Sequence, residues 1–282
     1  MHFRARFTLL IPLAVLFTLI PTAIAQLSQS GPTPRALIEK AVAFKNKTSR
    51  TRYTYFELDH LQNRFKDRPV FNRRLFLDAT TLYEYTWIGD LPYGRIVELQ
   101  GKPLTGDALA KEQARYDHAL AEHNGLAADD RAKSLHMRMV KYDIKVSELL
   151  TPAYTLTEPR QEAIDGNLLH VIDCIPVPST GSVHPTDTRH VQLWIAESGA
   201  ILRVISDIIA DEPEMLHGSH MQFDSQIIDG DVLPLHTVGH FYTPVTKNII
   251  IVDIEETYTR YRRFNVTSRV VSADDQPIVT SR

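Results

Sequence analysis

The chain has 282 residues, of which 43% are hydrophobic and 23% are charged, and its formal net charge is −3. This composition allows a packed core and excludes a wholly disordered chain. The slight excess of acidic residues argues against nucleic-acid binding, which normally needs a basic surface.

The chain begins with the features of a secretory signal peptide. Arg4 and Arg6 precede the apolar run Phe7–Ile20, and Ala23-Ile24-Ala25 has the small residues of a cleavage site. The alternative is a retained membrane anchor, but the run is short for a spanning helix. We therefore expect a signal peptide over 1–25, cleavage near Ala25, a periplasmic or secreted protein, and a polar leader over 26–33.

The next segment has the pattern of a short amphipathic helix. Thr33 is a suitable N-cap, and Pro34 suits the first helical position. The apolar stripe of this helix contains Leu37, Ile38, Ala41 and Phe44. Such a stripe predicts a helix that covers one face of a sheet.

Two long strands are predicted next, the first over Arg52–Leu61. One side of this strand carries Thr54, Phe56 and Leu58. The other side carries Tyr53, Tyr55, Glu57 and Asp59. One side of the second strand carries Leu75, Leu77, Ala79, Tyr83, Tyr85 and Trp87. A side this aromatic suits either a sheet that lines an apolar interior or an ordinary core.

A polar helical segment interrupts the strands. After a short strand at Arg95–Leu99, the stretch Asp107–Met139 is rich in helix-forming residues, with a break at Asn124-Gly125. Its polarity predicts an exposed helical insertion. A short helix at Ile144–Leu150 follows and ends before Pro152.

From Tyr154 the pattern is almost entirely β. The predicted strands are Tyr154–Ile164, Leu168–Val177, Val191–Ile195, Ala200–Ile209, Ser219–Ile228, Leu233–Tyr242 and Ile249–Tyr261. The turns between them include Asp165-Gly166, Ser198-Gly199 and Asp229-Gly230. Adjacent hairpins predict an antiparallel meander. No linker divides the chain, so we expect a single, mainly β domain of the α+β class over 34–282, with the insertion at 107–139.

Three motifs resemble the LolA-like outer-membrane lipoprotein-sorting superfamily. The hairpin Trp194–Arg203, WIAESGAILR, is similar to the tryptophan-led hairpin of that family, with Ala196 where Asp is common. The run Asp229–Pro234, DGDVLP, resembles the family's D-G-x-x-L-P start of the next strand. The segment Tyr258–Phe264, YTRYRRF, resembles the Y-x-x-Y-x-x-F ends of its uncharacterised bacterial members.

The resemblance implies a curved, unclosed antiparallel β-barrel, or half-barrel, whose concave face is covered by helices and holds lipid or acyl chains. The implied partners are therefore a lipid or acyl chain, a membrane surface or an envelope protein. Strand parity leaves open which side is concave. The candidates for an apolar lining are Phe56, Leu58, Tyr83, Tyr85, Trp87, Leu193 and Ile195.

Arg260 and Arg262 share one side of the last strand, with Arg263 opposite. The pair could bind a phosphate headgroup or a lipid surface. The alternative, which we favour, is a charged edge that prevents strand-to-strand aggregation.

The histidines raise a metal hypothesis. His236 and His240 are four residues apart on a predicted strand, which places them about 13 Å apart, too far to share one ion. A site that joins His217 and His220 to a neighbouring strand is geometrically possible, but solvated or core histidines explain the pattern better. We therefore expect no metal and no cofactor.

Nucleophilic chemistry has little support in the sequence. No G-x-S-x-G, H-E-x-x-H or P-loop motif occurs. Glu255 and Glu256 cannot act as paired acids, because adjacent strand residues point to opposite faces. The single cysteine, Cys174, is either a nucleophile or a small buried apolar residue, and we favour burial.

These observations predict a non-enzymatic periplasmic protein that binds a lipid or another apolar molecule and carries lipid or acylated cargo across the envelope. One alternative is a hydrolase or metal-dependent enzyme that uses His217, His220 or His236. Another is an envelope scaffold or assembly protein whose cavity is filled by its own side chains.

Overall fold

The computed structural model describes residues 31–48, 53–66, 77–88, 91–127, 145–178, 188–245 and 248–263. The predicted signal peptide with its cleavage site, most of the leader, and residues 128–139 of the predicted insertion lie outside the described residues. The described helices and strands all belong to one compact unit, Pro32–Arg282.

The N-terminal half consists of a helix, four consecutive strands and two further helical segments. Its elements are α1 (Pro34–Thr48), β1 (Tyr53–Phe65), β2 (Asp78–Ile88), β3 (Leu91–Leu99), β4 (Lys102–Pro103), α2 (Gly106–Gly125) and the short 3₁₀ helix η1 (Val146–Leu150). Helix α1 begins where predicted, and the Ala36 amide donates a hydrogen bond to Thr33 Oγ1, 3.3 Å away. Helix α2 ends at the predicted Asn124-Gly125 break and is mostly exposed.

The C-terminal half is the expected meander. Its strands are β5 (Tyr154–Leu156), β6 (Arg160–Ile164), β7 (Asn167–Pro176), β8 (Arg189–Ala196), β9 (Ile201–Ile208), β10 (His220–Ile228), β11 (Asp231–Val245) and β12 (Asn248–Arg263). The single strand predicted over Tyr154–Ile164 is wrong, because two strands occupy this stretch. Pro159 lies between them, and a proline supplies no N–H for a sheet hydrogen bond.

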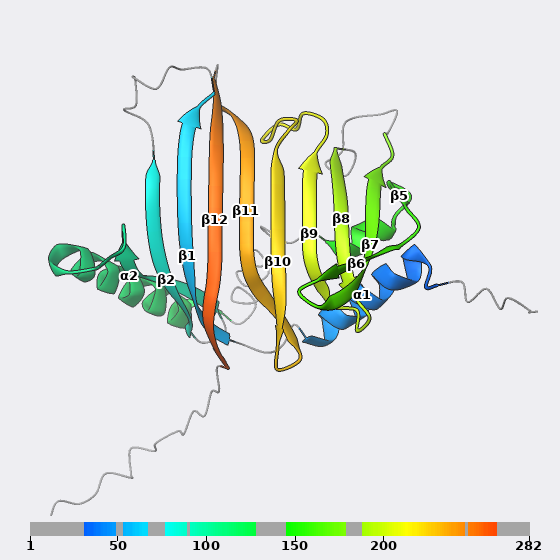
Figure 1. The fold of residues 1–282 in the computed structure, drawn as a ribbon. Coiled ribbons are helices and arrows are strands. Elements are labelled where there is room, and N and C mark those ends of the chain that lie inside the picture. Colours follow the sequence, from blue (N-terminus) through cyan, green and yellow to red (C-terminus); the bar gives the residue numbers. More distant parts are fainter. Residues whose placement is uncertain are drawn as a thin grey trace, which may run out of the picture. The chain divides into compact units, whose positions relative to one another are not determined.

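The twelve strands in the described part of the chain form one antiparallel sheet in the order β4-β3-β2-β1-β12-β11-β10-β9-β8-β7-β5, with β6 paired to β7 (Figure 1). The sheet does not close on itself, which confirms the predicted mainly β half-barrel with helices. Tight turns join neighbouring strands at Asp165-Gly166 and Asp229-Gly230. Both residues of each turn have positive φ, as a type I′ hairpin requires.

The longest-range pairing joins the two ends of the sequence. Strand β1 pairs with β12 from Tyr53 opposite Arg263 to Phe65 opposite Ile250, and the two strands lie side by side in Figure 1. The hairpin pattern predicts the meander but not this contact. It is nevertheless the contact that builds one continuous sheet from the two halves of the chain.

The two faces of the sheet can be followed from strand to strand, because residues directly opposite in register point to the same side. One such row crosses seven strands through Leu193, Val204, Phe223, Thr237, Glu256, Asp59 and Thr81. Leu193 packs under α1, so we name this side the inner face and the opposite side the outer face. None of the described helices combines the length and apolarity needed to cross a membrane.

Candidate ligand-binding face

Five tyrosines gather on the inner face of β1, β2 and β12, and we name them the tyrosine cluster. Its members are Tyr55, Tyr83, Tyr85, Tyr258 and Tyr261. The Tyr55 and Tyr85 rings stack with centroids 4.7 Å apart, and Tyr261 lies 5.3 Å from Tyr55. The cluster extends to Tyr258, whose ring centroid is 5.9 Å from that of Tyr55, and to Tyr83, whose ring centroid is 6.1 Å from that of Tyr85. These contacts join three strands into one continuous aromatic surface.

Backbone irregularities place two of these rings. Arg260 has a φ of 57°, and the β1–β12 register shifts there, which brings Tyr261 to the inner face beside Tyr55. On the other side, Gly94 is opposite Tyr85, and a Cβ at Gly94 would lie 3.0 Å from the Tyr85 ring. A glycine in a strand commonly allows such a close approach, and here it accommodates the stacked ring.

Three carboxyl groups lie within this aromatic surface. Glu57 is only 8% exposed and is opposite Tyr83 on one side and Tyr258 on the other. Asp59 and Glu256 are opposite each other on β1 and β12. The Tyr258 hydroxyl donates a hydrogen bond to Glu256 Oε2 over 2.6 Å. The cluster therefore combines aromatic rings with closely spaced acids.

The environment of Glu57 and Asp59 favours their neutral forms. Burial raises the pKa of Glu57 to about 8, and the nearby charges of Glu256 and Asp59 add to this effect, while the Tyr85 hydroxyl acts against it. Burial and Glu256 also raise the pKa of Asp59. Burial is the main cause of the raised pKa of Tyr55 and Tyr85. At neutral pH the surface is consequently less charged than its sequence indicates.

The inner face of β7, β8 and β9 is built differently, and we name it the covered half. Leu37 and Ile38 of α1 and Leu149 of η1 pack onto it, each at most 2% exposed. The predicted lining residues Leu193 and Ile195 are both 0% exposed within this core. They lie on the inner face, where they pack against the protein's own helices.

The other predicted lining residues divide between the faces. Tyr83 and Tyr85 belong to the tyrosine cluster, and the Trp87 Nε1 donates a hydrogen bond to the Tyr53 carbonyl beside it. Phe56 and Leu58 lie on the outer face, where Leu58 is 44% exposed. The structure therefore brings Tyr83 and Tyr85 together in the tyrosine cluster and places Leu193 and Ile195 together in the covered half.

The two candidate headgroup residues are exposed. Arg260 places its guanidinium 5.1 Å from the centre of the Phe56 ring, which belongs to the outer face. Arg262 is opposite Thr54, another outer-face residue. Neither side chain lies on the same face as the tyrosine cluster.

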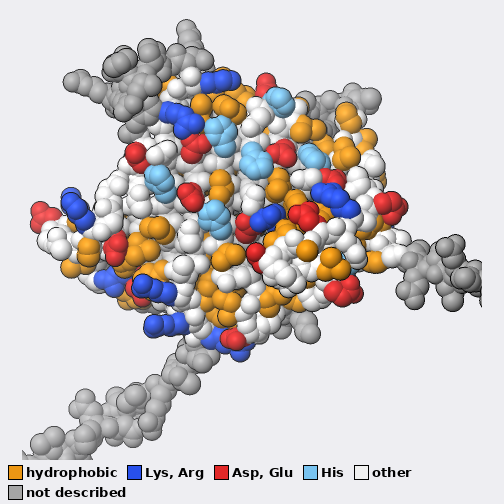
Figure 2. All heavy atoms as spheres, in the orientation of Figure 1, with side chains coloured by type: hydrophobic (Ala, Val, Ile, Leu, Met, Phe, Trp, Pro, Cys, Tyr) orange, Lys and Arg blue, Asp and Glu red, His pale blue; other side chains and the backbone are white. Residues whose placement is uncertain are grey.

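Histidines and acids cover the outer face, and Figure 2 shows a surface on which such side chains gather over the central strands. His220 Nδ1 lies 2.6 Å from Asp207, and His236 Nε2 lies 3.2 Å from Glu255. His217 instead belongs to the loop before β10, where its amide donates to Asp211. Within the described ranges, no three His, Cys, Asp or Glu side chains are arranged to hold a metal ion. Glu255 and Glu256 point to opposite faces, as predicted.

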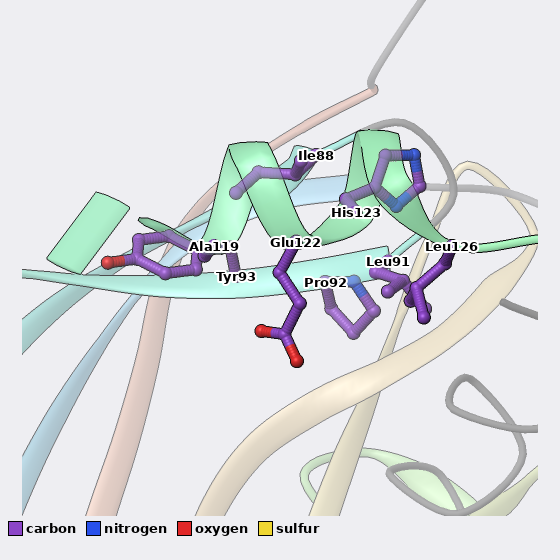
Figure 3. Close-up of a pocket in the computed structure, with 8 residues that line it drawn as sticks. All are labelled: Ile88, Leu91, Pro92, Tyr93, Ala119, Glu122, His123 and Leu126. Atoms are coloured by element: carbon purple, nitrogen blue, oxygen red, sulfur yellow. The ribbon is translucent and has the colours of Figure 1, made fainter. Parts of the chain in front are cut away.

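A small cavity lies between α2 and β3 (Figure 3). It measures about 40 Å³ and is lined by Ile88, Leu91, Pro92, Tyr93, Ala119, Glu122, His123 and Leu126. Next to it, buried Glu112 accepts hydrogen bonds from Tyr93 Oη and from the Arg115 guanidinium. This volume suits water-sized groups rather than an acyl chain. The contacts fix α2 against β3.

Cys174 is buried in the covered half with 0% exposure. Burial is the main cause of its raised pKa, about 12, and Asp173 adds to the shift. A thiol that stays protonated and inaccessible is a poor nucleophile. The structure therefore supports the packing role predicted for it.

Sequence reasoning missed the acidic part of the site. The alternation on β1 places Tyr55, Glu57 and Asp59 on one side, whereas the predicted lining contains Phe56 and Leu58 from the opposite side. The missing fact was the β1–β12 pairing, which adds Tyr258 and Glu256 to that same surface.

Comparison with protein-family models and with curated proteins gives no match. Among solved structures, the chain is similar to a LolA superfamily protein from Nitrosomonas europaea, with 11% identity, a TM-score of 0.29, and coverage of 86% of this chain and 99% of that one. It is also similar to an outer-membrane lipoprotein-sorting protein domain from Vibrio parahaemolyticus, with 10% identity, a TM-score of 0.36, and coverage of 84% of this chain and 94% of that one. A third similar structure is the Mycobacterium tuberculosis lipoprotein LppX, with 12% identity, a TM-score of 0.30, and coverage of 81% of this chain and 94% of that one. These likenesses concern the fold and name no ligand for this chain.

Proposed function

We propose that this protein is a non-enzymatic envelope protein that binds a lipid or another amphipathic molecule at the tyrosine cluster on its inner face. The observation that carries this proposal is the difference between the two halves of that face. Helix α1 fills the covered half with apolar side chains. In the tyrosine cluster, by contrast, only Tyr258 is buried, and the other four tyrosines are partly exposed.

Physical chemistry supports an amphipathic ligand here. Tyrosines provide large apolar ring surfaces together with hydroxyl groups that can bond to a polar headgroup. Each methylene of an acyl chain that leaves water at such a surface contributes about 0.8 kcal/mol. The largely neutral Glu57 lowers the cost of bringing an apolar chain near it.

The export of the protein to the periplasm, by way of the signal peptide at 1–25, belongs to the same proposal. A ligand carried in a half-barrel can cross an aqueous compartment without exposing its chain to water. The proposal therefore includes a carrier role for lipid or acylated cargo.

Native mass spectrometry of protein purified from the periplasm tests the proposal, combined with organic extraction of bound molecules. We expect a copurifying amphiphile that is lost in Tyr85→Glu, because the new charge enters the aromatic surface. The control is Leu58→Glu on the outer face of the neighbouring strand, which should retain it. Ligand-free protein that also binds no lipid in vitro would contradict the proposal and favour a scaffold.

A further inference from the structure

The acids of the tyrosine cluster differ from the other buried acids in how they are paired. Glu112 is bound by Arg115 at 2.7 Å, and Glu212 by Arg189 at 2.9 Å. Glu57 is as well buried as Glu212, at 8% exposure each, yet no lysine, arginine or histidine forms an ion pair with it among the described residues. The same holds in the described ranges for Asp59 and Glu256. A buried acid without a cationic partner is costly, because burial disfavours its charge.

The rings around these acids add a second, independent preference. The face of a tyrosine ring carries negative potential and attracts cations within about 6 Å of its centre. Five tyrosine rings line this part of the sheet, with neighbouring centroids 4.7 to 6.1 Å apart. The protein already shows such a contact elsewhere, where the Arg115 guanidinium lies 4.8 Å from the Tyr93 ring centre.

We infer that the headgroup recognised at the tyrosine cluster is a cation, an amine or quaternary ammonium carried by an amphiphile. This inference rests on the proposed function and specifies its ligand class. The ring faces would attract the cationic group, while Glu57, Asp59 and Glu256 would supply the opposite charge. The alkyl chain would extend over the remaining apolar surface of the inner face.

The charges around the tyrosine cluster disfavour an anionic headgroup at the same place. Such a group would approach Asp59 and Glu256, whose charges would repel it. The arginines that could compensate, Arg260 and Arg262, lie with the outer face. Arg263 is held at Tyr53 by a hydrogen bond of 3.3 Å.

The inference also predicts how affinity depends on pH. Glu57 faces Asp59 along β1, Tyr83 and Tyr85 on β2, and Glu256, Tyr258 and Tyr261 on β12. Its pKa is raised to about 8 without ligand. A bound cation stabilises the carboxylate, so binding releases a proton and tightens as pH rises through this range. The nearby His60 and Arg115 act against the raised pKa of Asp59 and of Tyr83, respectively.

Isothermal titration calorimetry on the full chain tests the inference with three probes that share one alkyl chain. The probes are dodecyltrimethylammonium, dodecyl sulfate and dodecyl maltoside, each below its critical micelle concentration. We expect the ammonium to bind at least about tenfold more tightly than the sulfate, in line with cation–ring and charge pairing. Its affinity should increase between about pH 6 and about pH 9.

Matched variants separate the contribution of the acids to ammonium binding from general effects on amphiphile binding. Glu57→Gln should weaken ammonium binding by about tenfold and remove most of its pH dependence, while leaving maltoside binding unchanged. Glu256→Gln should weaken it less, because this acid is more exposed. Glu84→Gln provides the control, since Glu84 lies on the outer face of β2 opposite Phe56. It should bind all three probes like the original chain.

The outcomes distinguish this inference from the function on which it rests. If the sulfate or the maltoside binds as tightly as the ammonium, the cationic headgroup is excluded and amphiphile binding stands. Failure of all three probes to bind would overturn both proposals. Unchanged ammonium affinity in both Glu57→Gln and Glu256→Gln, with circular dichroism confirming their folds, would also overturn the inference.

Discussion

The covered half and the tyrosine cluster lie on the same face of one sheet, but their chemistry is opposite. In the covered half, residues such as Ile172 and Leu193 are 0% exposed and pack in one core with apolar side chains from α1, η1 and adjacent strands. In the cluster, aromatic rings surround Glu57, an acid without an ion-pair partner in the described part of the chain. One half secures the fold, which allows the other to keep groups that cost stability.

The largest predicted effect separates the halves by their contribution to stability. Leu193→Ala should lower the free energy of unfolding by about 4 kcal/mol, because it opens a cavity beneath α1 in a fully buried site. Urea denaturation of the full chain measures this change. The matched substitution Tyr83→Leu, at a partly exposed ring, should cost less than about 1.5 kcal/mol.

Equal costs for these two substitutions would contradict the comparison. They would show that the tyrosine cluster is as essential to the fold as the covered half. The rings would then be better explained as core, the alternative that the aromatic strand pattern left open.

A smaller effect concerns pH. The pKa of Glu57 is about 8 in the folded chain and near 4.5 when unperturbed, with burial as the main cause. Between these values the folded protein holds a proton that the unfolded chain has released, so the free energy of unfolding falls as pH rises. Glu57→Gln should remove this slope and make the protein more stable than the original chain near pH 8, because the amide carries no charge to bury.

Thermal or urea unfolding across that pH range measures the slope. The control is Glu84→Gln on the outer face, which should keep the slope of the original chain. A slope that survives in Glu57→Gln would show that another group carries the titration. Stabilisation with loss of ammonium binding, by contrast, would identify Glu57 as a residue kept for binding.

Local patterns explain how much of this fold the sequence predicts. The stripe of Leu37, Ile38 and Ala41 predicts a covering helix, and Asp229-Gly230 predicts a hairpin, because each depends only on near neighbours. The β1–β12 pairing joins residues from nearly opposite ends of the sheet's sequence, such as Tyr53 and Arg263, and no local pattern encodes it. The inner face therefore could not be chosen from alternation alone.

The same limit explains the candidate site. Tyr83 and Tyr85 can be predicted as candidates because one side of their own strand is rich in aromatic residues. Tyr258, Tyr261 and Glu256 lie on the last strand, and their approach to β1 depends on the distant pairing and on the irregular backbone at Arg260. A site assembled from both ends of a sequence becomes visible only when the register is known.

The smallest predicted effect is on the outer face, at Leu58, which is 44% exposed and opposite Leu82. Leu58→Ser should change the free energy of unfolding by less than about 0.5 kcal/mol, since little buried apolar surface is lost. It should also leave amphiphile affinity unchanged in the calorimetric titration. Leu58 neighbours Glu57 in sequence but points to the opposite face, so comparing variants at these two positions tests the outer face against the inner face at the same place on β1. Weaker binding in Leu58→Ser, with normal binding in Tyr85→Glu, would place the ligand on the outer face beside Phe56 and Arg260. That result would overturn the assignment of the inner face as the binding surface.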